Sequence, residues 1–275
     1  GRQSLGSDEV AARFGPGVCY MGMDMEQIAE LPERVATTGW TPGNGTVFFN
    51  FAWRGKERLT DGDFNDQMRN AIYAAEAVRA AKEIGCTKFV NAGTLEETFV
   101  EQFLESTGDE AYVSDRTNYA IAKLTARDMC TIVAYVGKID YIHTRMSVPL
   151  ALDLSGGNYV AGVFRRIVGG LDYESPNSRQ LFDIITTDQV ARAYYLIGQK
   201  GKNKADYFIG TSRPATLQRF FEHFRQIVEG ATSDSIEWTN DRRAKLFDVK
   251  ELRRDTGFVP STGFQEIIEL AQQKS

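Results

Sequence analysis

Short apolar segments that suit β-strands alternate with long segments of helical periodicity in the first half of this chain. The strand-type segments cover residues 18–21, 47–51 and 88–91, and the helical patterns cover residues 61–84 and 116–136. Strands and helices that alternate in this way form βαβ units, whose strands pair in parallel. The alternation therefore predicts an α/β fold with a Rossmann-type, doubly wound parallel sheet.

The second half of the chain predicts a smaller lobe of mixed character. A Gly-, Pro-, Asn- and Ser-rich stretch follows an expected helix at 159–168. We predict that residues 1–150, with about 181–200, form the larger domain, and that residues 151–180 and 201–275 form the smaller C-terminal lobe. The other expected elements are strands at 139–146, 181–186 and 207–209, helices at 188–197 and 217–228, and two short helices near Lys250 and Glu266.

The composition argues against several classes of partner. The 275 residues carry a formal net charge of −5, and the longest run of Lys or Arg is the pair Arg242 and Arg243. Such a chain offers no basic surface for nucleic acid or an anionic membrane. No apolar stretch approaches the ~18 residues of a membrane span. We therefore expect a soluble, cytoplasmic protein that binds neither nucleic acid nor membrane.

The cysteines and histidines follow no metal-binding or catalytic pattern. Cys19, Cys86 and Cys130 have no CxxC spacing, so we expect reduced thiols in the core and no metal site. His143 is expected in a buried strand and His223 on a helix surface. Neither histidine has a Ser or Cys partner in a motif such as GxSxG, so triad hydrolysis is not expected.

Tyr119 and Lys123 lie four residues apart in an expected helix, so their side chains share one face. A neighbouring ammonium favours the phenolate and lowers the pKa of a tyrosine, which makes it a general acid or base for an alcohol proton. Thr94, at the C-terminal end of an expected parallel strand, would hydrogen-bond the same oxygen. Asn70 lies in the preceding helix. Because the Tyr–Lys spacing alone is common, an unrelated pair on a solvated face is the alternative.

These four residues, in this order and on these elements, resemble the catalytic tetrad of the extended short-chain dehydrogenase/reductase superfamily, in its branch of NAD-dependent nucleotide-sugar epimerases and dehydratases. Residues 48–53 stand where members of that branch read roughly VxHxAA. Residues 183–193 stand where they read DxxxVxDxAxA. The resemblance covers nearly the whole chain.

The resemblance implies an NAD(P)-binding larger domain, a substrate-binding C-terminal lobe and a homodimer formed through the two long helices. Lys123 would also contact the nicotinamide ribose, Asn70 would maintain a water-linked proton path, and Asp24 would lie near the adenine of NAD or NADP. For Asp24, a solvated strand-end carboxylate is the alternative. The residues expected to bind the cofactor are Asp24, Phe51, Ala52, Trp53, Tyr119 and Lys123. Those expected to bind a nucleotide-sugar substrate are Thr94, Glu96, Arg213 and Arg219.

The chain departs from the pattern of this family near its beginning. It has no GxxGxxG turn after its first expected strand, so the cradle for a dinucleotide pyrophosphate is not in the sequence. We expect that about 30 to 45 residues, one βαβ unit, precede Gly1 in the complete protein. The alternative is a degenerate, non-catalytic binding or scaffold relative. A further departure is Val148, which stands where many members have an asparagine that contacts the substrate.

Residues 94–97 read Thr-Leu-Glu-Glu, whereas 4,6-dehydratases of the family carry an acidic pair directly after the threonine. Glu96 matches the acid that removes the C5 proton, and Leu95 replaces its partner. The same run equally fits the first turn of a helix, with Thr94 and Glu97 in a capping box. Both interpretations stay open.

We expect a reaction in which hydride leaves or joins C4 of a nucleotide-linked hexose, as in an epimerase or a 4-ketoreductase. Tyr119 would exchange the hydroxyl proton, Lys123 would lower its pKa, and Thr94 would orient the C4 oxygen. The alternatives are 4,6-dehydration with Glu96 as base and a non-catalytic binding role. The sequence leaves the nucleotide, the sugar and the choice between NAD and NADP open.

Overall fold

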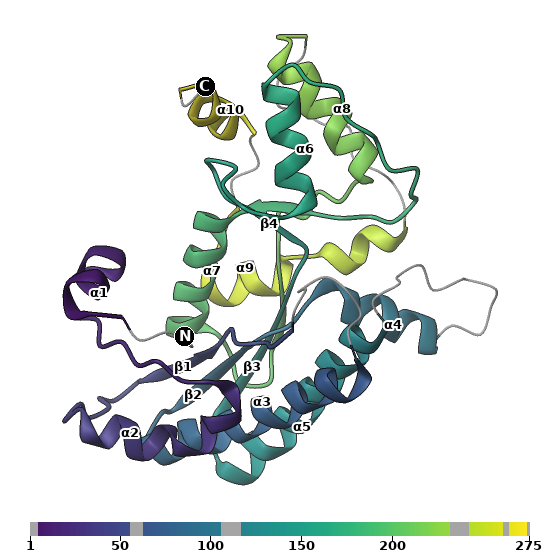
Figure 1. Ribbon diagram of the computed structural model, residues 1–275. Helices are drawn as coiled ribbons and strands as arrows, with labels where there is room; N and C mark the ends of the chain where they lie inside the picture. The colour runs from purple at the N-terminus through teal and green to yellow at the C-terminus, as the bar shows by residue number, and fades with distance from the viewer. Residues whose placement is uncertain (1–4, 56–62, 106–116, 232–241, 261–263, 274–275) are drawn as a thin grey trace. The chain divides into compact units, whose positions relative to one another are not determined.

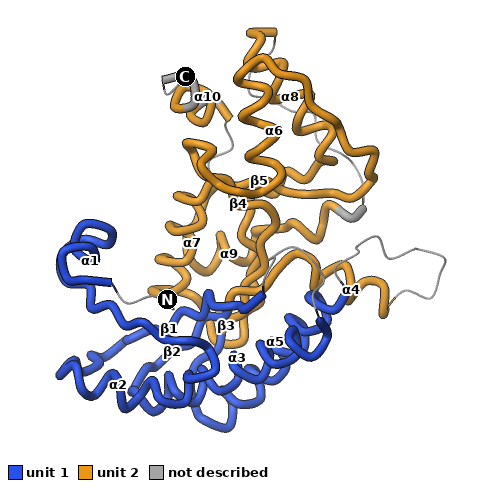
Figure 2. The backbone as a smooth tube through the Cα atoms, in the orientation of Figure 1, with its two compact units in different colours: residues 1–91, 115–141 blue, residues 92–114, 142–275 orange. Residues whose placement is uncertain are grey.

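The computed structural model describes residues 5–55, 63–105, 117–231, 242–260 and 264–273 (Figure 1). The chain folds into two compact units (Figure 2). Unit 1 comprises residues 1–91 and 115–141, and unit 2 comprises residues 92–114 and 142–275. The division near residue 150 into a cofactor domain and a substrate lobe stays a prediction.

Parallel strands form the framework of the fold. In unit 1, β1 (Val47–Asn50) pairs in parallel with β2 (Lys88–Ala92). Strand β3 (Asp140–Met146), which begins in unit 1, pairs in parallel with β6 (Asp206–Ile209) in unit 2. The hydrogen-bonded order of these strands is β1-β2-β3-β6. The α/β class with a parallel, Rossmann-type sheet is therefore confirmed.

A second, smaller sheet belongs to unit 2. Strand β4 (Val148–Leu150) pairs in parallel with β5 (Ile184–Thr186). Just before β5, Phe182 forms an isolated antiparallel bridge with Ala215. The strand expected at 181–186 is therefore a short strand preceded by a single bridge.

Two long helices of unit 1, α3 (Phe64–Ile84) and α5 (Thr117–Gly137), lie side by side (Figure 1). Their shared core consists largely of small residues, among them Ala71, Ala74, Ala126, Cys130 and Ala134. Because the distance between packed helices depends on the side chains at the contact, these small residues let the two backbones approach closely. The pair gives a rigid base to the candidate residues of α5.

Local chemistry fixes both ends of α3. The Asp63 carboxylate caps the first turn by accepting hydrogen bonds from the N–H groups of Asn65 and Asp66, at 2.9 and 3.2 Å. The helix ends at Ile84 and is followed by the cap residue Gly85, whose φ is 99°. A Cβ on Gly85 would lie 2.9 Å from Cγ of Pro42. A larger residue would therefore be strained in both backbone and side chain.

The prediction of a strand at residues 18–21 is wrong. Residues 18–24 form no described strand and lie between α1 (Ser7–Phe14) and a short 3-10 helix, η1 (Met25–Glu30), which α2 (Leu31–Thr37) follows. Apolar β-branched and aromatic residues suit a pleated surface, but a strand also needs a neighbour that supplies hydrogen bonds. In the part of the chain that the structure describes, no strand pairs with this segment.

Two expectations for single buried residues also need correction. Cys86 and Cys130 are buried as predicted, but Cys19 is exposed, because its segment lies outside any sheet. His143 is buried in β3 as predicted. His223 is buried as well, contrary to expectation, since it lies on the apolar face of α8 with its ring 6.3 Å from that of Phe264.

Phenylalanine rings pack against one another in the main core of unit 2. Helices α6 (Tyr159–Val168) and α8 (Leu217–Val228) lie side by side (Figure 1). The rings of Phe164 and Phe224 stack with centroids 3.8 Å apart, and Phe264 meets Phe164 edge to face at 5.7 Å. Aromatic pairs of this kind add to the stability that buried area provides.

The other helices of unit 2 are α4 (Leu95–Glu105), α7 (Thr187–Lys200), η2 (Arg242–Phe247), α9 (Lys250–Thr256) and α10 (Gln265–Gln273). Within the described ranges, none of the helices combines the length and apolar character needed to cross a membrane.

Candidate active site

Tyr119 and Lys123 lie on the same face of α5, as their spacing predicts. Nζ of Lys123 is 5.7 Å from the centroid of the Tyr119 ring. Lys123 is only 5% exposed, whereas Tyr119 is partly exposed. Burying an ammonium is costly unless neighbouring groups compensate. The placement of Lys123 therefore depends on what surrounds it.

An aromatic ring covers the Lys123 ammonium. The indole of Trp53, just after β1, lies with its ring centroid 3.9 Å from Nζ. The same indole meets the Tyr119 ring edge to face, with centroids 5.9 Å apart and planes at 89°. Nε1 of Trp53 donates a hydrogen bond to Oε1 of Gln67 at 2.8 Å. We call Trp53, Tyr119 and Lys123 the Trp–Lys–Tyr cluster.

Asn70 is buried in α3 and binds the main chain next to Trp53. Its Nδ2 donates to the carbonyl oxygens of Arg54 and Asp66, at 2.8 and 3.2 Å. Its Oδ1 accepts the N–H of Arg54 at 2.8 Å. Both amide protons are therefore engaged. The water-linked proton path stays a prediction, and the structure adds a role that the sequence did not suggest, which is to hold the segment after β1.

The remaining cofactor candidates of unit 1 are less buried. Phe51 is 58% exposed and stacks on Phe49 with centroids 5.9 Å apart, and Ala52 is exposed. Asp24 caps η1, since its carboxylate accepts the N–H of Glu26 at 3.3 Å. Contacts of Phe51, Ala52 and Asp24 with a cofactor stay predictions.

Thr94 lies directly before α4, in unit 2. Oε1 of Glu97 accepts the backbone N–H of Thr94 at 2.8 Å, and Oγ1 of Thr94 accepts the N–H of Glu96 at 3.4 Å. This is the reciprocal pattern of a helix cap, so the capping interpretation is right for Thr94 and Glu97. Glu96 is buried in the first helical turn. Its role as a dehydration base, and substrate binding by Thr94 and Glu96, stay predictions.

A buried histidine holds the second oxygen of Glu97. Nε2 of His143 lies 2.7 Å from Oε2 of Glu97, and their side chains are 2% and 0% exposed. Gly93 makes room for this pair, because a Cβ there would lie 2.4 Å from both Oε1 of Glu97 and Nε2 of His143. The turn that carries Thr94 is thus fixed by two buried polar side chains.

Arg145 in β3 joins α4 to β6. Its guanidinium donates to Oγ1 of Thr98 at 2.8 Å, to Oε2 of Glu101 at 2.5 Å and to Oδ2 of Asp206 at 2.6 Å. Burial alone would lower the pKa of Arg145, but the carboxylates of Asp206, Glu101 and Glu97 outweigh it and raise that pKa. The arginine is therefore held as a permanent cation within an ion-pair network.

The two arginines expected to bind substrate lie in different surroundings. Arg219 is exposed in the first turn of α8. Arg213 is partly buried in the turn after β6, where the N–H groups of Thr211 and Ser212 donate to the Asp183 carboxylate at 2.7 and 3.0 Å. Burial raises the pKa of Asp183 to about 6, although these hydrogen bonds limit the rise. Substrate binding by Arg213 and Arg219 stays a prediction.

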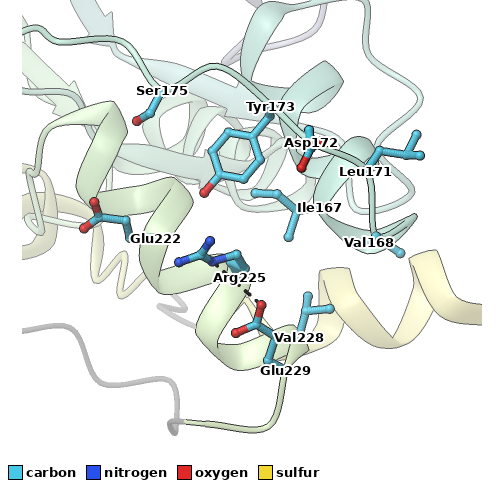
Figure 3. Close-up of a pocket in the computed structure, with 11 residues that line it drawn as sticks. Ile167, Val168, Leu171, Asp172, Tyr173, Ser175, Glu222, Arg225, Val228 and Glu229 are labelled. Carbon is cyan, nitrogen blue, oxygen red and sulfur yellow. Dashed lines mark ion pairs between the residues drawn. The ribbon is translucent and has the colours of Figure 1, made fainter.

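A pocket of about 520 Å³ opens beside the C-terminal ends of α6 and α8. Figure 3 shows the Tyr173 ring, Ile167 and Arg225 around it, with Arg225 pairing with Glu229 at 3.8 Å between Nε and Oε1. Its lining mixes apolar, acidic and basic side chains. The residues expected to form the active site do not line this pocket.

Unit 1 offers groups that fit one end of a dinucleotide. An ammonium and a phenol on one helix face supply the donors that a ribose hydroxyl and a reacting alcohol oxygen need. The sequence contains no GxxGxxG turn for the pyrophosphate, and cofactor binding by the described residues stays a prediction. Among these residues, no group of three or more His, Cys, Asp or Glu could hold a metal ion.

A parallel α/β sheet with a tyrosine and a lysine on one face of a long helix fits the class of dinucleotide-dependent enzymes. The family model described as "NAD dependent epimerase/dehydratase family" matches residues 46–210. The chain belongs to this family, whose members are NAD-dependent enzymes. The resemblance found in the sequence is thereby confirmed.

Several solved structures share this fold. The UDP-glucose 4-epimerase of Thermotoga maritima, solved with UDP-glucose, is 17% identical with a TM-score of 0.68, over 98% of this chain and 89% of that chain. RMD from Pseudomonas aeruginosa, complexed with NADPH, is 16% identical with a TM-score of 0.66, over 93% and 87%. WbmG of Bordetella bronchiseptica, with NAD and UDP, is 13% identical with a TM-score of 0.65, over 94% and 80%. At these identities the similarity shows the fold alone.

A comparison with curated proteins found no match to this chain.

Three contacts were not predicted from the sequence. Trp53 was expected to bind the cofactor, but its contact with Lys123 has no signal in the spacing. The grip of Asn70 on Arg54 and the pairing of His143 with Glu97 likewise join residues that are distant along the chain. The expected burial of His143 in a strand is the signal that could have suggested a buried polar partner, because buried polar groups are hydrogen-bonded.

Proposed function

We propose that this protein is an NAD(P)-dependent nucleotide-sugar epimerase or 4-ketoreductase that moves a hydride at C4 of the hexose. The observation that carries the proposal is the pairing of Tyr119 with the buried Lys123 on one face of α5. Family membership supports it. The ligands named for the structural relatives, UDP-glucose and UDP, support a nucleotide-linked sugar.

In this proposal Tyr119 moves the proton of the reaction. During oxidation its phenolate accepts the proton of the C4 hydroxyl, and during reduction the phenol returns a proton to the carbonyl oxygen. The charge of Lys123 favours the phenolate, because an opposite charge nearby stabilises the ionised form. Lys123 and Tyr119 would also hold the nicotinamide ribose. When bound, NAD or NADP supplies a centre that accepts and returns the hydride.

The other predicted residues take supporting roles in the proposal. Thr94 would hydrogen-bond the C4 oxygen, and Asn70 would support the proton relay while it holds the backbone of Arg54. Arg213 and Arg219 would bind the diphosphate, for which guanidinium groups are well suited.

One observation favours 4,6-dehydration as a second candidate function. The carboxylate of Glu97 serves the cap of α4 and the hydrogen bond to His143, and Glu96 is the residue that matches the family's C5 base. Glu96 is buried in this turn, and a carboxylate is a residue type that can remove a proton as a general base. A Glu96→Gln variant with full dehydration activity would remove this candidate.

The proposal is tested by titrating the purified protein with NADH and NADPH, followed by fluorescence, and by incubating it with UDP-, dTDP- and GDP-linked hexoses. We expect saturable binding of one dinucleotide and a product changed at C4, identified by NMR. A 4-keto-6-deoxy product would select dehydration. Absence of saturable binding of either dinucleotide would contradict the proposal and favour a non-catalytic relative.

A further inference from the structure

We propose that Trp53 is a positioning residue, which holds the Lys123 ammonium against its indole face and keeps it beside Tyr119. The inference rests on the proposed function, because the effect on turnover acts through Tyr119 and Lys123. It concerns a side chain for which the family resemblance implies only cofactor binding.

The geometry is that of a cation–π contact. Nζ of Lys123 lies 3.9 Å from the centroid of the Trp53 ring, well within the ~6 Å at which such contacts are favourable. Trp is the strongest of the aromatic partners because its ring carries the most negative face. Lys123 is almost fully buried, and a contact of this kind strengthens as water is removed.

The choice of an indole has a chemical consequence. A carboxylate at this place would also stabilise the ammonium, but it would neutralise the charge that the Tyr119 phenolate needs. An indole carries no net charge, so it stabilises the cation and leaves its field intact. In a buried site with a low effective dielectric, that field acts strongly on the neighbouring phenol.

The indole itself is fixed from two sides. Its Nε1–H donates to Oε1 of the buried Gln67 at 2.8 Å. The next residue, Arg54, has its backbone N–H and C=O bound by the Asn70 side chain. Side chains of α3 therefore determine where the ring lies, and the ring in turn determines where Lys123 lies. A preorganised group of this kind costs no reorganisation during the reaction.

The sequence context makes this a property of the present chain. Trp53 stands at the last position of the VxHxAA pattern, where members of the family branch typically have an alanine. A methyl group could not cover an ammonium, so Lys123 would need a different neighbour. The charge of Lys123 also lowers the pKa of the Cys130 thiol, but burial outweighs this effect and raises that pKa to about 12, so the thiol stays neutral.

The first test uses the protein without cofactor. Lysine labelled with ¹³C at Cε gives one NMR signal for each lysine, and a methylene held over an indole face is shifted upfield by the ring current. We expect one upfield signal that disappears in Lys123→Met, which assigns it. Trp53→Leu should return the Lys123 signal to the range of exposed lysines, and Trp53→Phe should retain part of the shift.

The second test measures turnover against pH. We expect Trp53→Leu to lower kcat about tenfold, to leave the KM of the nucleotide sugar nearly unchanged, and to move the limb that reports Tyr119 to higher pH. Trp53→Phe, which keeps an aromatic face, should lose about threefold or less. Trp40→Phe, at an exposed tryptophan, serves as the matched control and should leave both the spectrum and the pH profile unchanged.

The outcomes separate this inference from the proposed function. An unshifted Lys123 signal in the unmodified protein, or a Trp53→Leu variant with an unchanged spectrum and pH profile, would overturn the inference. If Trp53→Leu fails to fold, the spectrum of Trp53→Phe alone decides, since an unchanged Lys123 shift would contradict a role for the indole. Full activity in Lys123→Met and Tyr119→Phe would instead overturn the proposed function.

Discussion

Nε2 of His143 lies 2.7 Å from Oε2 of Glu97, and both side chains are almost completely buried. The other oxygen of Glu97 accepts the N–H of Thr94 at 2.8 Å. One carboxylate thus ties a central strand to the first turn of α4. A buried, doubly hydrogen-bonded carboxylate of this kind is expensive to lose, because its partners remain buried without it.

We predict that Glu97→Ala lowers the free energy of unfolding by about 3 to 5 kcal/mol, as when one partner of a buried pair is removed. Glu97→Gln keeps an oxygen for the Thr94 N–H and should lose about 1 to 3 kcal/mol. Urea unfolding measures both values. Glu105→Ala, at an exposed position of the same helix, is the control, and a Glu97→Ala protein no less stable than this control would contradict the prediction.

Asn70→Ala should free the segment that carries Trp53. The substitution removes three hydrogen bonds, two of which hold the backbone of Arg54. We expect a loss of about 2 to 4 kcal/mol in unfolding free energy. Because the segment next to Trp53 loosens, the upfield Lys123 signal should weaken as well. Asn65→Ala, exposed in the same helix, should change neither quantity by much, and an unchanged Lys123 signal in Asn70→Ala would refute the link.

Asp183 should make stability depend on pH. Burial raises the pKa of its carboxyl from 3.8 to about 6 in the folded protein. Below about pH 4 both states hold the proton, and between the two pKa values only the folded state keeps it. The contribution of Asp183 to the free energy of unfolding is therefore fully present at low pH and is lost as the pH rises through about 6.

Asp183→Asn removes this titration. We expect the stability advantage of the unmodified protein over Asp183→Asn to be larger at pH 4 to 5 than at pH 7 to 8, by about 2 kcal/mol. Urea unfolding at several pH values checks the sign. An advantage that is constant over this range, or one that grows with pH, would contradict a raised pKa.

Three apolar side chains of α5, Ile132, Tyr135 and Val136, are exposed. We predict that they form part of a homodimer interface, as the family resemblance implies, because a patch of this kind is unfavourable in water. Sedimentation should give the mass of a dimer, and the double variant Ile132→Glu and Val136→Glu should give that of a monomer. Leu104→Glu, at an exposed apolar residue of α4, should leave the mass unchanged. A monomer in the unmodified protein would contradict the prediction.

Elements with strong local signals could be predicted from the sequence. Helix α6 is observed at Tyr159–Val168, as expected, because Asn158 caps its first turn through the N–H of Ala161 at 2.8 Å and an apolar stripe follows. Helix α8 begins after Thr216 for the same reason. Residues 18–21 had only composition in their favour, and the pairing that makes a strand is a property of neighbours distant in sequence.

The same distinction applies to the site. The pairing of Tyr119 with Lys123 is set by helical geometry, so four residues of sequence suffice to predict it. The contact of Trp53 with Lys123 depends on how β1 and α5 pack in unit 1, and no local pattern encodes it. The capping role of Glu97 was visible in its spacing from Thr94, whereas the partner on its other oxygen, His143, was not.

The substitution Tyr119→Phe tests the acid–base role of Tyr119. The variant keeps the ring that packs on Trp53 and removes only the hydroxyl, so the free energy of unfolding should change by less than about 1 kcal/mol. Tyr135→Phe, on the same helix, is the matched control.

The decisive measurement is the rate of hydride transfer from a nucleotide sugar that the protein accepts, followed as the near-ultraviolet absorbance of the reduced nicotinamide in a single turnover. We predict that Tyr119→Phe slows this step by about 10²- to 10⁴-fold and that Tyr135→Phe leaves it unchanged. A Tyr119→Phe protein that transfers hydride at the rate of the unmodified enzyme would contradict an acid–base role for Tyr119.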